Sequence, residues 1–375
     1  MNLLYGVVGE GMGHATRSSV VLEHLLAKGH RIRVVVSGRA HDFLHAAFDH
    51  LDGIDIVEIE GLSLAFDGPT IDVPETILSN LELLPAKLRA NLKAYREIVA
   101  DGFEADAVVS DFESWAYFYA RNHLIPVVSI DNMQVINRCT HPPEITSGVK
   151  RDFKLSRAIV RAKLPGAYHY LAATFFVPEV RKKRTTLVPP ILRPEVLDAV
   201  REAGDHVLVY QSGASDEALL ELLATVDAEF RVYGFHRDER IGNVHLRPFS
   251  EDGFLDDLRT ARGAVATGGF SLMSECVHVG VPLLAVPLDG QFEQELNSRW
   301  LARLGYGSWT PALSKGVIER FLERCDDHER SLQDYPRQSN GMTLACVDEL
   351  LARIDNGEMP GPTKLIAPAL GKYEG

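Results

Sequence analysis

Apolar runs and helical stretches alternate along the first part of the chain. The runs at 2–8 and 31–36 are short and rich in Leu, Val and Ile, and between them, over 15–28, apolar residues recur at helical spacing. Such runs are typical of strands that are covered on both faces in a parallel sheet. Further strands of this kind are expected at 54–59, 106–110 and 127–130. The pattern predicts an α/β fold built on a parallel sheet.

A second series of the same kind follows the proline-rich run VPPILRP at 188–194. Its strands are expected at 206–210, 229–233, 243–246, 264–266 and 283–286, with helices over 216–226 and 250–261. The prolines mark a boundary, because proline fits neither a helix interior nor a central strand. We therefore predict two domains, 1–188 and 189–358, followed by a loose tail at 359–375.

One stretch of the second series, 265–297, carries a pattern that suits a phosphate group. Its apolar start ends at Thr267-Gly268-Gly269, and a helical pattern begins at Phe270. Adjacent glycines let the backbone approach a ligand closely, and a helix start offers unpaired N–H groups and a positive dipole end. Together these features predict a phosphate or diphosphate site. The alternative is an ordinary strand–turn–helix of an α/β domain.

Polar side chains near this turn are candidates for recognising hydroxyl groups. Glu275, one turn into the helix, can accept two hydrogen bonds from vicinal hydroxyls such as those of a ribose. Its alternative role is that of a solvated helix carboxylate. The strand at 283–286 leads to a polar cluster that suits the hydroxyls of a sugar, namely Asp289, Gln291, Glu293, Gln294 and Asn297.

The first strand also ends in a glycine-rich loop, GEGMGH. Its spacing is G-x-G-x-G rather than the G-x-G-x-x-G of dinucleotide sites, and Ser37-Gly38 offer no carboxylate to a ribose after the second strand. A nicotinamide or flavin site is therefore not expected. The loop presents His14 near a helix N-terminus, whose dipole disfavours the imidazolium and keeps the ring a free base. A structural cap or a hydrogen-bonding loop histidine is the alternative.

Composition narrows the choice of partners. The 375 residues carry a formal net charge of −13, which disfavours nucleic acid as a partner. The four cysteines are scattered without a C-x-x-C pair, so we expect neither a metal site nor a disulfide framework, in keeping with a cytoplasmic location. Two prolines interrupt the apolar run VGVPLLAVPL, and no membrane-spanning segment is expected.

The segment 150–184 departs from the acidic character of the chain. It contains ten Lys and Arg residues against only Asp152 and Glu179. Phe153, Ile159 and Val160 recur among the charges, which predicts a basic amphipathic helix. One interpretation is a solvated face over the core. The other is a surface for anionic lipid or a phosphorylated acceptor, with peripheral contact at the inner face of a membrane.

Taken in order, these parts resemble the donor-binding signature of nucleotide-sugar glycosyltransferases with the GT-B fold, closest to the MurG-like and UDP-glucuronosyl/UDP-glucosyltransferase-like groups. The matching residues are Gly269, Phe270, Ser274-Glu275, Gly280-Val281-Pro282, Pro287, Glu293-Gln294 and Asn297. GMGHATR and SDFESWAYFYARNHLIP resemble first-domain segments of the same groups. The resemblance implies two Rossmann-like doubly wound domains facing across a cleft, the first binding the acceptor and the second the nucleotide-sugar.

The resemblance also implies roles for single residues. His14 corresponds to the general base, and Asp111, just past the strand at 106–110, corresponds to the aspartate that pairs with it. Capping of its own helix is a second role for Asp111 that is compatible with the first. Ser212 and Gly213 correspond to the turn that faces the donor diphosphate.

Three features bear on the nucleotide. Phe249 lies in the segment that positions the base in these groups. Many relatives have histidine at the position of Thr267 and asparagine at that of Ser271, near the diphosphate, and here two hydroxyls can substitute as donors. The tryptophan that stacks on the base in plant-type enzymes is absent, which leaves the base open.

The predicted activity is inverting transfer of a sugar from a UDP- or dTDP-linked donor to an acceptor hydroxyl of a small or lipid-linked molecule. No metal or other cofactor is required, because helix N-terminal amides stabilise the leaving diphosphate. A UDP-sugar 2-epimerase of the same fold and a non-catalytic sugar-nucleotide-binding regulator are the alternatives. Incubation of the protein with the donor alone separates the epimerase from the transferase, since an epimerase needs no acceptor.

Overall fold

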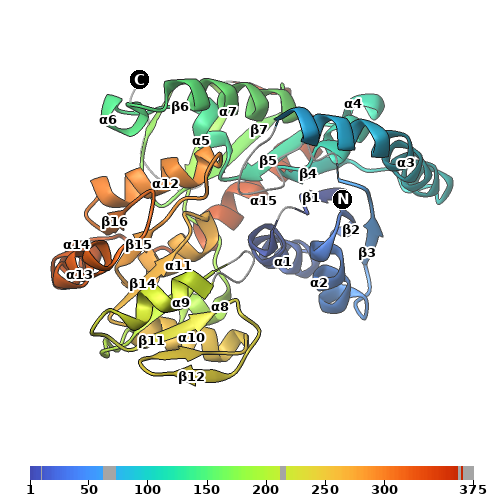
Figure 1. Cartoon of the computed structure of the whole chain (residues 1–375). Coiled ribbons are helices and arrows are strands. Elements are labelled where there is room, and N and C mark those ends of the chain that lie inside the picture. The colour runs from blue at the N-terminus through green and yellow to red at the C-terminus, as the bar shows by residue number, and fades with distance from the viewer. Residues whose placement is uncertain (10, 62–72, 212–216, 362–364, 366–375) are drawn as a thin grey trace. The chain divides into compact units, whose positions relative to one another are not determined.

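The structure, a computed structural model, describes residues 1–9, 11–61, 73–211, 217–361 and 365, and for 73–85 the backbone alone. The chain forms two compact units (Figure 1). Unit 1 consists of Met1–Pro142, Gly148–Arg193 and Gln338–Gly375, and unit 2 consists of Pro143–Ser147 and Pro194–Arg337.

Unit 1 is built on a seven-stranded sheet. Its strands are β1 (Asn2–Val7), β2 (Arg31–Val36), β3 (Ile54–Glu58), β4 (Ala107–Asp111), β5 (Val127–Asp131), β6 (Cys139–Thr140), β7 (His169–Ala173), β8 (Glu179–Val180) and β9 (Thr185–Val188). Its helices are α1 (Met12–Ala27), α2 (Arg39–Phe48), α3 (Val73–Ala100), α4 (Ser114–His123), α5 (Gln134–Arg138), α7 (Lys150–Lys163) and α15 (Gly341–Asp355). The sheet order is β3-β2-β1-β4-β5-β7-β9 with every neighbouring pair parallel, while β6 and β8 form a separate antiparallel pair.

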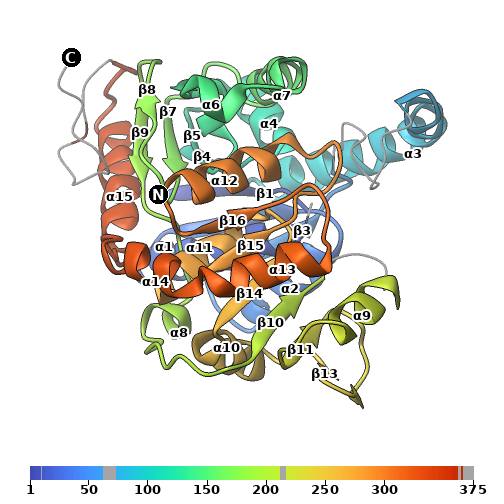
Figure 2. The ribbon, with the colours of Figure 1, turned by 60° about the vertical axis from the view of Figure 1, so that its left-hand side comes forward.

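Unit 2 repeats the plan with a second seven-stranded sheet. Its strands are β10 (Val207–Tyr210), β11 (Phe230–Tyr233), β12 (Glu239–Ile241), β13 (Val244–Leu246), β14 (Gly263–Ala266), β15 (Leu283–Ala285) and β16 (Gly307–Trp309). Its helices are α6 (Pro143–Thr146), α8 (Pro194–Leu197), α9 (Glu217–Ala224), α10 (Glu251–Thr260), α11 (Phe270–Val279), α12 (Phe292–Arg303), α13 (Lys315–Glu323) and α14 (Cys325–Gln333). The order is β12-β13-β11-β10-β14-β15-β16, parallel except at β12, and β14, β15 and β16 run side by side (Figure 2).

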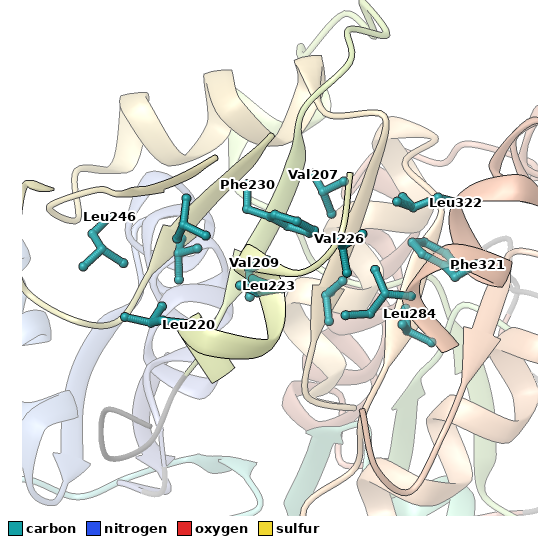
Figure 3. Close-up of a cluster of buried hydrophobic side chains, with 14 of the residues drawn as sticks. Val207, Val209, Leu220, Leu223, Val226, Phe230, Leu246, Leu284, Phe321 and Leu322 are labelled. Carbon is teal, nitrogen blue, oxygen red and sulfur yellow. The ribbon is translucent and has the colours of Figure 1, made fainter. Parts of the chain in front are cut away.

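Apolar side chains from the strands and from α9 and α13 form the core of unit 2 (Figure 3). Val207 and Phe230, on neighbouring strands, are fully buried against Leu223 of α9 and Phe321 of α13. A central strand with no polar alternation needs such cover, because its backbone and side chains would otherwise face water. The core therefore fixes the sheet whose strand ends carry the donor-site candidates.

The apolar patterns predicted most strands at or within two residues of their bounds. β2 spans the expected 31–36, and the basic segment forms α7. Helix α2 and the strands β7, β9 and β16 had no counterpart in the expected elements. Three residues, Gly-Ser-Trp in β16, are too few to show a period. Among helices in the described ranges, none is both long and apolar enough to cross a bilayer.

The division between the units differs from the expected one at three places. The crossing falls at Arg193 and Pro194 rather than at 188. Pro143–Ser147 groups with unit 2 although 1–188 was expected to form one domain, and helix α15 groups with unit 1 although 189–358 was expected to form the other. Side-chain contacts of the C-terminal segment give the reason: Asn340 bonds the backbone of Leu192 in both directions, and Asp348 lies 2.8 Å from His24 Nε2. The expected loose tail at 359–375 lies almost entirely outside the described residues.

Candidate active site

Each sheet has one point where the strand order reverses. In unit 1 this point lies between β1 and β4, since β2 and β3 continue on one side and β5 on the other. Ligands of open α/β sheets bind outside the carboxyl ends of the strands at such a point. His14 follows β1 and Asp111 ends β4, so two residues 97 positions apart in the chain meet there.

Asp111 and His14 are in direct contact. His14 Nδ1 lies 2.8 Å from Asp111 Oδ1, and the aspartate side chain is 1% exposed against 17% for the histidine. The arrangement positions the imidazole by a buried carboxylate and leaves part of the ring accessible. The pairing that the resemblance implied is thus present in unit 1, whereas its catalytic role is a proposal taken up below.

Arg17 completes the network, and the sequence analysis did not single it out. Its Nε donates to Asp111 Oδ2 at 2.7 Å and its Nη2 to Asp111 Oδ1 at 2.5 Å, while Nη1 donates to Asn132 Oδ1 at 2.7 Å. Ser18 Oγ adds a bond to Asp111 Oδ2 at 3.0 Å. A helical residue three positions after His14 shares its face, and a buried carboxylate requires a cation, so both signals pointed to Arg17.

Electrostatics of the network favour an ionised Asp111. Burial acts to raise the pKa of this carboxyl, but Arg17 and His14 outweigh it and lower the pKa to about 2. The neighbouring Asp131, at the end of β5, has no such cation at hydrogen-bond distance, and burial raises its pKa to about 6. The two strand-end carboxyls therefore differ in charge state in weakly acidic solution, and Asp111 is the anion.

His14 Nδ1 has two neighbours that favour opposite tautomers of the ring. Arg17 Nη2, which can only donate, lies 2.6 Å from this nitrogen, and Asp111 Oδ1, which as a carboxylate oxygen only accepts, lies 2.8 Å from it. In the tautomer with its proton on Nδ1, the ring donates to Asp111 and its basic lone pair lies on Nε2.

In unit 2 the reversal lies between β10 and β14, and the predicted glycine turn follows β14. The two glycines have different neighbours. A Cβ on Gly268 would lie 2.4 Å from the carbonyl oxygen of Gln294 on α12, whereas a Cβ on Gly269 would meet only Thr267 Oγ1, at 3.9 Å. Gly268 is needed for packing of α12, and Gly269 leaves open space.

Helix α11 begins directly after Gly269. Its N-cap residue is Gly269, which has no side chain that could accept from the first backbone N–H groups of the helix. Phe270 is buried, while Thr267, Ser271 and Glu275 are half-buried. The turn thus offers amides, two hydroxyls and a carboxylate on one short segment.

The polar cluster at the start of α12 is largely bonded to itself. Gln294 accepts from Leu288 N at 3.0 Å and donates to Gln291 Oε1 at 2.6 Å, and its side chain is 7% exposed. Asn297 donates to Glu293 Oε1 at 2.5 Å. Gln294 shapes the loop after β15, and half-buried Glu293 is the more accessible of the predicted pair.

Phe249 follows β13 on the same edge of the sheet. Its side chain is 56% exposed and packs edge-on against Tyr233 at 6.4 Å between ring centroids. An exposed, buttressed aromatic ring is suited to stacking on a planar ligand. Ser212 and Gly213, predicted to face the diphosphate after β10, lie outside the described residues. Within the described ranges, no group of His, Cys, Asp and Glu side chains is arranged to hold a metal ion.

Comparison with known proteins identifies the family. The family model described as glycosyl transferase family 1 matches residues 1–326. The chain belongs to this family. An uncharacterized glycosyltransferase of Methanosarcina mazei is 25% identical over 386 residues, which cover 94% of this chain and 98% of the relative.

Solved structures of glycosyltransferases share the fold. UGT2 of Phytolacca americana, in complex with UDP-2-fluoro-glucose and pterostilbene, has a TM-score of 0.62 at 15% identity over 94% of this chain and 99% of that one. MurG of Acinetobacter baumannii has a TM-score of 0.59 at 14% identity, over 93% and 99%. The protein is a glycosyltransferase with the GT-B fold, and the resemblance found in the sequence is confirmed.

Proposed function

We propose that this glycosyltransferase transfers a sugar from a nucleoside diphosphate donor, UDP- or dTDP-linked, to an acceptor hydroxyl with inversion. The contact between His14 and Asp111 carries the proposal. A base in unit 1 that is oriented by a buried carboxylate can remove the proton of an acceptor hydroxyl. The family model and the uncharacterized relative support sugar transfer and do not fix the donor or the stereochemistry.

The proposed chemistry starts at His14 Nε2. This nitrogen takes the proton as the acceptor oxygen attacks the anomeric carbon from the side opposite the nucleotide, and the bond from that carbon to the diphosphate breaks. Asp111 stabilises the imidazolium that forms. Arg17 holds Asp111 in place from both oxygens, so the carboxylate cannot turn away from the ring.

Unit 2 binds the donor in this proposal. The N-terminal amides of α11 and the hydroxyls of Thr267 and Ser271 meet the diphosphate, and Glu275 accepts from the ribose hydroxyls. Gly269 gives the phosphates access to the backbone. Phe249 stacks on the base and Glu293 bonds the sugar. A helix terminus can stabilise the leaving diphosphate without a metal, and no other cofactor is required.

One solved structure supports a nucleotide-sugar donor, and helix α7 bears on the acceptor, which stays open. The Phytolacca americana protein was solved with UDP-2-fluoro-glucose and pterostilbene, a nucleotide-sugar and a small acceptor. The basic helix α7 offers a surface for a lipid-linked acceptor, with a cytoplasmic location and peripheral contact at the inner membrane face, and this part of the proposal stays a prediction.

A nucleotide screen followed by donor turnover tests the proposal. We expect UDP or dTDP to raise the melting temperature, since binding to the folded state stabilises it. The matching UDP- or dTDP-sugar should then be hydrolysed slowly, with the released sugar observed by NMR in the inverted anomeric configuration. Retention at the anomeric carbon would contradict the mechanism, and epimerisation at C2 of donor alone would favour the epimerase.

A further inference from the structure

Five cations converge at the C-terminal end of α5 in unit 1. They come from three segments: Arg138 ends α5, Arg157 and Arg161 lie on α7, and Arg181 and Lys182 follow β8. The β6–β8 pair brings the last two to α5, since Arg181 N donates to Arg138 O at 3.0 Å. We call these five residues the basic cluster.

The hydrogen bonds of the basic cluster go to neutral groups. Arg138 Nε donates to Thr185 Oγ1 at 2.6 Å and Arg181 Nη2 to the carbonyl oxygen of Asn137 at 3.0 Å. Lys182 Nζ donates to Asn137 Oδ1 at 2.5 Å. Capping of the α5 carbonyls accounts for Arg181. It does not account for five cations around a helix of five residues.

Within the described part of the chain, no carboxylate forms an ion pair with the basic cluster, and Asp131 favours the charge of Arg138 only from a longer distance. Asp152 and Glu179, the acids nearest in sequence, form no ion pair with the cluster. Several arginines elsewhere in the two units are paired, as Arg33 is with Asp55 at 3.0 Å and Arg231 with Asp257. In a chain of net charge −13, acids are plentiful, so a place that lacks them is a feature of the fold.

The neighbouring cations act on Lys182. Burial, with Arg181, Arg138, Arg161 and Arg157 acting in the same direction, lowers the pKa of this ammonium to about 8. The charged groups that shift this pKa most are thus cationic, and Nζ donates to the neutral Asn137 amide. A bound anion would reverse this effect, because an opposite charge favours the ammonium.

We propose that the basic cluster binds a phosphate or diphosphate group. Guanidinium forks pair with phosphate oxygens bidentately and an ammonium adds a point charge, so two arginines and a lysine suffice for one group. Arg161 and Arg181 are exposed and Lys182 is half-buried, which leaves their donors accessible to a ligand. Arg157, stacked on Phe153 at 4.3 Å, and buried Arg138 supply charge from beneath.

The position of the cluster connects it to the proposed base. Asn132, which bonds Arg17, precedes α5, and the cluster surrounds the other end of this helix. Five helical residues rise about 1.5 Å each, so the two ends of α5 are ~8 Å apart, and Asn132 and Arg17 add to the separation between the cluster and His14. Resting on the proposed function, the acceptor in unit 1 is then a molecule that carries a phosphate or diphosphate group in addition to its reacting hydroxyl.

Binding of inorganic pyrophosphate to the full-length protein tests the site without turnover. Arg161→Gln/Lys182→Gln removes two cluster cations, and Arg151→Gln/Lys154→Gln removes two exposed cations of α7 outside the cluster. By calorimetry at low ionic strength, the first pair of substitutions should weaken the binding of pyrophosphate at least about tenfold at one site. The second pair should leave the dissociation constant nearly unchanged. Diphosphate bound by unit 2 is unaffected by either pair.

A second probe separates the two sources of phosphate. Vesicles of neutral lipid with phosphatidic acid should bind the wild type and the Arg151/Lys154 pair but not the Arg161/Lys182 pair if the phosphate belongs to a lipid headgroup. Pyrophosphate binding without vesicle binding assigns the cluster to a soluble phosphorylated ligand. The proposal would be overturned if the two variant pairs bound pyrophosphate and vesicles equally well, or if the wild type bound neither probe at the basic cluster. This outcome does not depend on the turnover of His14 variants, so it is distinguishable from a failure of the proposed function.

Discussion

Arg17 donates to both carboxylate oxygens of Asp111, from Nε at 2.7 Å and from Nη2 at 2.5 Å. Both side chains are buried, at 5% and 1% exposed. The pair is close to neutral as a whole, so protonation of His14 adds a charge to a balanced site rather than completing an ion pair. This relationship makes Asp111 an orienting group that is itself held.

Removal of Arg17 should destabilise the fold. Arg17→Gln leaves Asp111 buried without its cation, and loss of one partner of a buried pair costs about 3–5 kcal/mol. Denaturant unfolding of Arg17→Gln, Asp111→Asn and the double variant measures the coupling. We expect the double variant to be more stable than the sum of the two losses implies. Additive losses would show that the two residues act independently.

His14→Ala should lower kcat by about 10²–10⁴-fold, the usual contribution of a positioned base, with little change in donor affinity. Asp111→Asn should lower kcat too, since the carboxylate that contacts His14 Nδ1 and stabilises the imidazolium in the proposed mechanism is then lost. Steady-state assays with donor titration separate the two effects. His45→Ala, a half-exposed histidine on α2, is the matched control. Full turnover by His14→Ala would remove it from the mechanism.

The adjacent glycines should respond in opposite ways to alanine. Gly268→Ala drives a Cβ into the backbone of α12, so the melting temperature should fall. Gly269→Ala has open space and an ordinary extended backbone, with φ −63°, so the fold should keep its stability while nucleoside diphosphate affinity drops. Melting curves with and without nucleotide compare the two. A stable Gly268→Ala that binds normally would argue against the described packing.

Glu275→Ala should weaken the binding of the nucleoside diphosphate by roughly 1.5–3 kcal/mol, because charge-assisted hydrogen bonds to the ribose are lost. Calorimetry gives the dissociation constant directly. Glu319→Ala on α13 removes an exposed carboxylate, 3.7 Å from Lys315, and serves as control. An unchanged constant for Glu275→Ala would exclude this carboxylate from the donor site.

Asp131 should make stability depend on pH. Its pKa is raised to about 6 in the fold, so its contribution is fully present below about 3.8 and is lost as pH rises through 6. Asp131→Asn should therefore gain stability over the wild type at pH 8, by about 1–3 kcal/mol, and little at pH 3, below the unfolded pKa. Urea unfolding at the two pH values checks this. A gain in stability of equal size at both pH values would show that the gain does not come from the titration of Asp131.

The sequence pattern predicted the strands and helices that are decided by interactions between residues close together in the chain. Strand β2 follows from its apolar run, and α11 from the glycine break before Phe270. Contacts across the sheet were different: Asp111 and His14 were paired through family resemblance, because no spacing within either segment shows that β1 and β4 are neighbours. The internal bonds of Gln294 appear only once strands and helices are placed, whereas the spacing of Arg17 from His14 was a signal in the sequence itself.

Helix α15 belongs to unit 1 although it comes last among the helices. A premature stop codon after Arg337 would consequently damage unit 1 and spare most of unit 2, the reverse of what position along the gene implies. Deletion of 338–375 should expose the surface around Leu192 and remove Asp348 from its contact with His24, while the proposed nucleotide binding by unit 2 persists. The segment 194–337 contains all of unit 2 except Pro143–Ser147, and it is the continuous piece of this chain best suited to independent expression.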